Sequence, residues 1–172
     1  MRTATYELNF DGGLLKRGFW LYVWEITTPQ HTHVYYVGRT GDSSSNNAQS
    51  PFNRMGQHLG FNDKSNVLRR RLKAKGLDPE ECVFRMVTHG PILEESTTEA
   101  EYRQRRDRIA AMEAALAARM HDVGYDVMNT VKCRIEVDEK TFATVVAAFT
   151  SRFPALHQEV SGENCEIGKR NQ

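Results

Sequence analysis

The sequence has few cysteines and no long apolar run. Its three cysteines, Cys82, Cys133 and Cys165, are far apart and odd in number, so we expect neither a disulfide framework nor a cysteine-rich zinc site. No stretch is apolar for long enough to cross a bilayer. The first ten residues lack the hydrophobic region of a signal peptide. We therefore expect a cytoplasmic protein with no membrane partner.

A strong net charge is lacking as well. The formal net charge is +1 over 172 residues, of which 26% are charged and 40% are hydrophobic, as in an ordinary single globular domain. A small total does not exclude a nucleic-acid partner, because the clustering of cations matters more than their sum. Residues 62–76 hold such a cluster. Its candidate contacts to a nucleic-acid backbone, which could equally be a solvated helix face, are Lys64, Arg69, Arg70, Arg71 and Lys73.

Three segments have the composition of β-strands. Phe19–Ile26 is rich in aromatic and β-branched residues, and both of its alternating faces are apolar, which predicts a central strand covered on both sides. His33–Gly38 follows after a short break, as an antiparallel partner would. Glu81–Thr88 predicts a third strand.

A short helix is predicted from Pro51 to about Gly60, with Ser50 as its N-cap. Arg54 and His58 are four residues apart and therefore share one face, which we expect to point outward. That pair suits a phosphate, because arginine is a planar charged fork and histidine moves protons near neutral pH. Two ordinary solvated residues are the alternative. The opposite face is expected to dock on the core through Phe52, Met55 and Leu59.

A longer helix is predicted over about Thr98–His121, because Thr98 and Glu101 form a capping box. At 100° per residue, Glu113 falls inside its apolar stripe. A carboxylate on a core-facing side is costly unless it is paired or holds a metal. Glu113 could therefore bond a buried arginine, reach water at the edge of the stripe, or bind a metal ion. The stripe consists of Ile109, Met112, Leu116 and Met120.

Taken in order, these residues resemble the pattern of the GIY-YIG nuclease superfamily. Its members carry two tyrosines on adjacent strands, an arginine and a histidine on the next helix, a metal-binding glutamate on a later helix, and then an asparagine. The corresponding residues here are Tyr22, Tyr36, Arg54, His58, Glu113 and Asn129.

The two strand signatures are kept to different degrees. The second is present as Tyr36-Val37-Gly38, whereas Trp20-Leu21-Tyr22 lacks the glycine of the first. The spacing of Arg54 and His58 is similar to that of the restriction-endonuclease branch. The resemblance implies an α/β (α+β) fold, with a small, mostly antiparallel three-stranded sheet flanked by helices.

The resemblance covers residues 19–130, and with it we expect four segments along the chain. These are an N-terminal extension that could hold an edge strand (1–18), the nuclease-like domain (19–130), a strand and a helix packed on the same domain (131–157), and a polar, mobile tail (158–172). In the third segment we expect the strand over Val131–Val137, and Asp138 should cap the helix.

The resemblance also implies a function: divalent-metal-dependent hydrolysis of phosphodiester bonds in a nucleic acid, which we expect to be double-stranded DNA. One Mg²⁺ or Mn²⁺ ion per active site would be held by Glu113. Tyr22 would be the general base, His58 would accept its proton, and Arg54 would clamp the phosphate. The remaining implied roles are positioning of phosphate or water by Tyr36, organisation of the site by Asn129 and contact with nucleic acid by Arg39.

Other functions fit parts of the pattern. The same fold could be an inactive nucleic-acid-binding or regulatory module, or the matches could be accidental in a fold that is no nuclease. His31 and His33 suggest zinc, but no third ligand follows at a recognisable spacing. A nuclease that cuts both strands would need a homodimer or two binding events, because one site cuts one strand.

Overall fold

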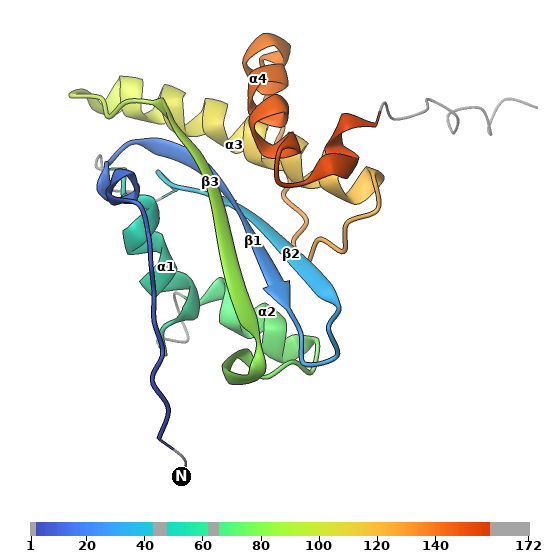
Figure 1. Ribbon diagram of the computed structural model, residues 1–172. Coiled ribbons are helices and arrows are strands. Elements are labelled where there is room, and N and C mark those ends of the chain that lie inside the picture. The colour runs from blue at the N-terminus through green and yellow to red at the C-terminus, as the bar shows by residue number, and fades with distance from the viewer. Residues whose placement is uncertain (1–2, 43–47, 62–65, 159–172) are drawn as a thin grey trace, which may run out of the picture.

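A three-stranded antiparallel sheet lies at the centre of the protein, with helices on both faces (Figure 1). The computed structural model describes residues 3–42, 48–61 and 66–158. The predicted α+β fold is confirmed. The strands follow the spatial order β2-β1-β3, with bounds β1 Phe19–Thr27, β2 His33–Arg39 and β3 Val83–Leu93.

The central strand β1 separates two hydrophobic cores. Because successive side chains of a strand point to opposite faces, Leu21 and Val23 enter one core while Trp24 and Ile26 enter the other. The first core lies between the sheet and the helices α3 (Glu99–Asp122) and α4 (Glu139–Thr150), and the second lies between the sheet and the helices α1 (Pro51–Leu59) and α2 (Val67–Ala74). The apolar character of both faces of β1 follows from this double burial.

The helices begin close to where their capping residues predict. Their bounds are α1 Pro51–Leu59, α2 Val67–Ala74, α3 Glu99–Asp122 and α4 Glu139–Thr150. Ser50, Thr98 and Asp138 each accept a hydrogen bond from the backbone N–H three residues later. Short 3-10 helices are η1 Gly12–Leu15, η2 Pro79–Glu81 and η3 Pro154–His157. None of the helices in the described part of the chain is long and apolar enough to cross a membrane.

Two strand predictions differ from the structure. The third strand continues to Leu93, past the predicted end at Thr88, because it pairs with β1 as far as Phe19 across a bulge. The predicted strand Val131–Val137 is wrong, since that segment is irregular. Its apolar side chains Val131 and Val137 pack on the first core without strand pairing.

The outer edge of β2 explains why no fourth strand forms there. The Tyr35 N–H donates to the Asp126 carbonyl at 2.8 Å, and the Met128 N–H donates to the Tyr35 carbonyl at 2.7 Å. Next along the edge, the Asn129 carboxamide bonds both backbone groups of Val37, accepting from its N–H at 2.9 Å and donating to its carbonyl at 2.7 Å. Residues 126–129 therefore take up this part of the outer edge of β2. Residues 3–10 are not a strand either, so the N-terminal extension holds no edge strand in its described part.

Candidate active site

Tyr22 of β1 and Tyr36 of β2 lie on the sheet face that α1 and α2 cover. Tyr22 is opposite Gly38 in the strand register, and its ring lies over that glycine. A Cβ atom at position 38 would lie 2.4 Å from Cε2 of Tyr22, far inside van der Waals contact. The glycine of the second signature therefore makes room for the tyrosine of the first.

Helix α1 turns Arg54 and His58 toward these tyrosines, so the predicted outward orientation is wrong. Nε2 of His58 lies 2.5 Å from the Tyr22 hydroxyl, and the imidazole is 2% exposed. Phe52, which was expected in the core, is 36% exposed and stacks on Phe10. His58 can be buried because the sheet beneath α1 offers its imidazole a polar partner, the Tyr22 hydroxyl. Met55 packs on the same core, as predicted.

The guanidinium of Arg54 is held from two sides. It donates to Oδ2 of Asp42 at 2.6 Å and to Oε1 of Gln57 at 2.8 Å. Its Nε has no hydrogen-bond partner among the described residues. Sequence reasoning missed Asp42 and Gln57, because an acid in a polar loop and an amide on a helix carry no pattern of their own.

Glu113 enters the site from α3 and forms an ion pair with Arg39 of β2. Nε of Arg39 donates to Oε2 of Glu113 at 2.9 Å, and both side chains are mostly buried. Of the open alternatives for Glu113, pairing with a buried arginine is therefore observed. Arg39 also donates to the Gly41 carbonyl. This residue, expected to contact nucleic acid, lies inside the site.

Glu113 offers a carboxylate oxygen, the kind of ligand that a hard cation prefers, beside the positive charge of Arg39. Burial raises the pKa of Glu113, and the neighbouring Arg39 opposes that rise. Only Oε2 takes part in the ion pair, and Oε1 has no hydrogen-bond partner in the described ranges. Mg²⁺ prefers oxygen ligands and keeps several waters, so one carboxylate together with substrate phosphate fits it. No group of three or more His, Cys, Asp or Glu side chains that could hold a metal ion is found within residues 3–42, 48–61 and 66–158, so Glu113 would be a single protein ligand.

The proton positions follow from burial. Burial raises the pKa of Tyr22 well above its usual value, and the charge of Arg54 partly opposes that rise. Burial, followed by the charge of Arg54, lowers the pKa of His58 to about 4. His58 is therefore neutral at pH 7. Nε2 of the neutral ring hydrogen-bonds the Tyr22 hydroxyl and accepts from it in the tautomer that carries the ring proton on Nδ1, an atom buried without a hydrogen-bond partner among the described residues.

The neutral imidazole predicts a pH dependence of stability. From pH 7 to pH 5 we expect the wild type to lose about 2 kcal/mol more unfolding free energy than a His58→Gln variant. The pKa of His58 is about 4 in the fold and 6.5 as its ordinary value, so in this window the unfolded chain binds a proton that the folded protein does not. Urea denaturation at several pH values measures the difference, and parallel curves for the two proteins would contradict it.

The basic cluster on α2 is partly engaged in bonds within the protein. Arg71 donates to the Met128 carbonyl at 2.8 Å. Arg69 lies over the Phe61 ring and pairs with Glu80. Arg70 and Lys73 are exposed. Lys64 lies outside the described residues.

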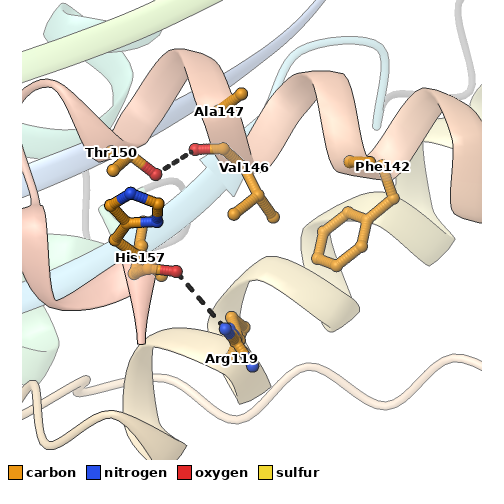
Figure 2. A pocket seen from close by; sticks show the side chains of 8 residues that line it. Arg119, Phe142, Val146, Ala147, Thr150 and His157 are labelled. Carbon is orange, nitrogen blue, oxygen red and sulfur yellow. Dashed lines mark hydrogen bonds between the residues drawn. The ribbon is translucent and has the colours of Figure 1, made fainter. Parts of the chain in front are cut away.

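A separate pocket of about 540 Å³ lies between α3, α4 and η3 (Figure 2). Phe142 and Val146 form part of its wall, and Arg119 donates to the Leu156 carbonyl at its edge. None of its lining residues belongs to the tyrosine site. Its only full positive charge, Arg119, already bonds backbone, which makes the pocket a weaker candidate for chemistry.

The described residues thus bring five of the predicted side chains together from three layers, while Asn129 acts through the backbone of β2. Comparison with protein-family models, with curated proteins and with solved structures finds no match for this chain.

Proposed function

We propose that this protein is a divalent-metal-dependent nuclease that hydrolyses phosphodiester bonds. The observation that carries the proposal is the 2.5 Å contact between the Tyr22 hydroxyl and Nε2 of His58. This contact gives the Tyr22 hydroxyl proton an acceptor, which is the geometry that a tyrosine general base needs. A guanidinium and a carboxylate from other elements complete the set of groups that phosphoryl transfer requires. The resemblance to the GIY-YIG nucleases supports the same proposal.

In the proposed reaction Arg54 binds the scissile phosphate through N–H donors that Asp42 and Gln57 leave free. Tyr22 removes a proton from the attacking water and passes its own hydroxyl proton to Nε2 of His58. The water oxygen attacks phosphorus, and the bond to the leaving oxygen breaks. Burial opposes the proton transfer from Tyr22 to His58, because it raises the pKa of Tyr22 and lowers that of His58, so the positive charge of Arg54 has to favour the phenolate. The imidazolium then releases its proton to solvent, and the leaving oxygen takes a proton up. Tyr36, whose pKa burial raises to about 12, keeps its hydroxyl proton and can orient the phosphate or water.

Glu113 would hold the metal ion, Mg²⁺ or Mn²⁺, which would supply stabilisation of charge on the phosphate and the leaving oxygen. Arg39 favours the ionised Glu113 carboxylate by pairing with Oε2, which leaves Oε1 for the ion. We propose DNA as the nucleic acid, with Arg70 and Lys73 as backbone contacts on the exposed side of α2. Cutting of both strands would require two copies of the protein or two binding events, because one site cuts one strand.

The test is cleavage of supercoiled plasmid and of single-stranded DNA and RNA, with Mg²⁺, Mn²⁺ or a chelator. Cleavage that needs the metal supports the proposal. A Tyr22→Phe preparation, purified in parallel, serves as the control for contaminating nuclease, and equal cleavage by both preparations would reject the proposal. Binding without cleavage of any substrate would favour the inactive nucleic-acid-binding module. The absence of both binding and cleavage would exclude both functions.

A further inference from the structure

The turn after β2 is fixed in place by bonds to β1. Thr40 is fully buried, accepts from the Trp20 N–H at 2.8 Å and donates to the Gly18 carbonyl at 2.6 Å. Gly41 has a φ of 76°, and a Cβ atom there would lie 2.4 Å from the Phe19 ring. Both its backbone conformation and its space therefore require glycine. The position of the next residue, Asp42, is set by these constraints.

Asp42 uses this fixed position to hold Arg54. Oδ2 of Asp42 and Nη2 of Arg54 are 2.6 Å apart, and the guanidinium is 16% exposed. An unrestrained arginine side chain keeps its rotamer entropy, which would have to be lost when a phosphate binds. A carboxylate that fixes the guanidinium beforehand removes part of that cost.

Resting on the proposed function, we infer that Asp42 is a positioning residue that orders Arg54 for the scissile phosphate. The turn Arg39–Asp42 then serves both charged groups of the site: its first residue pairs with Glu113 and its last with Arg54. Asp42 acts through Arg54 and makes no contact of its own with the reacting atoms.

The test compares Asp42→Asn and Asp42→Glu with Asp126→Asn, a matched control. Asp126 also forms an exposed ion pair, with Lys75, but outside the site. We expect Asp42→Asn to lower kcat/KM at least tenfold with an unchanged melting temperature. Asp42→Glu should restore part of the loss, and Asp126→Asn should equal the wild type. Equal kcat/KM for Asp42→Asn and Asp126→Asn would overturn the inference.

A second readout does not depend on cleavage. In NMR spectra, the Arg54 Nε–H signal should be slow to exchange in the wild type and in Asp126→Asn, and averaged or fast to exchange in Asp42→Asn. If the wild-type protein cleaves no substrate, the proposed function fails, and this signal alone decides the role of Asp42. An unchanged signal in Asp42→Asn would then overturn the inference, and a lost signal would support it.

Discussion

The Tyr22→Phe variant is expected to cleave nucleic acid about 10³-fold more slowly than the wild type at neutral pH. The substitution removes only the hydroxyl that is proposed to take the proton of the attacking water, and the ring can still lie over Gly38. It also leaves Nε2 of His58 buried without its partner, which should lower the unfolding free energy by about 1 kcal/mol. Single-turnover rates with excess protein and Mg²⁺ measure the chemical step, and urea denaturation measures the stability.

The control is Tyr35→Phe, on the neighbouring strand. Tyr35 faces the opposite core, where its ring packs on Tyr125 and Phe153, so the loss of its hydroxyl should leave the rate unchanged. A Tyr22→Phe rate within a factor of ten of the wild type would show that another group accepts the proton.

Gly38→Ala is expected to lower the unfolding free energy by about 3 kcal/mol and to abolish most of the cleavage. The added Cβ would fall 2.4 Å from Cε2 and 2.6 Å from the hydroxyl oxygen of Tyr22. The ring is completely buried, so it can move only by disturbing the second core or the bond to His58. Urea denaturation and single-turnover rates measure the two losses.

Gly56→Ala provides the matched comparison. Gly56 is an exposed glycine inside α1, and a Cβ atom there would meet nothing within 4 Å. Alanine has the higher helix propensity, so the variant should gain roughly 0.5–1 kcal/mol. If Gly38→Ala were as stable as the wild type, the close packing of Tyr22 on β2 would not be a constraint.

Local patterns were sufficient to predict most of the fold. β1 was recognisable because both of its faces are apolar, and the helices α1, α3 and α4 because Ser50, Thr98 and Asp138 cap them. The alternation over Val131–Val137 was misleading, since alternation predicts only that a segment has one apolar side. Whether such a segment joins a sheet depends on a free strand edge beside it. Residues 126–129 bond the outer edge of β2, so that edge is not free.

The candidate site was predictable by residue type but not by orientation. The spacing of Arg54 and His58 places them on one face of α1, yet a nine-residue helix with a mixed composition does not reveal which face is buried. Burial of His58 depends on a tyrosine hydroxyl that comes from β1, more than 30 residues earlier. Asp42 was not predicted for a similar reason, because its role depends on the placement of α1 above the turn.

The carboxamide of Asn129 has a consequence for association between molecules. It occupies the N–H and the carbonyl of Val37 in the manner of a paired peptide unit. The bonds from residues 126–128 to Tyr35 protect the adjoining part of the same edge. Unpaired strand edges are sites where another chain can add a strand. This part of β2 is therefore closed to edge-to-edge aggregation, and two copies that meet on DNA would have to do so through another surface.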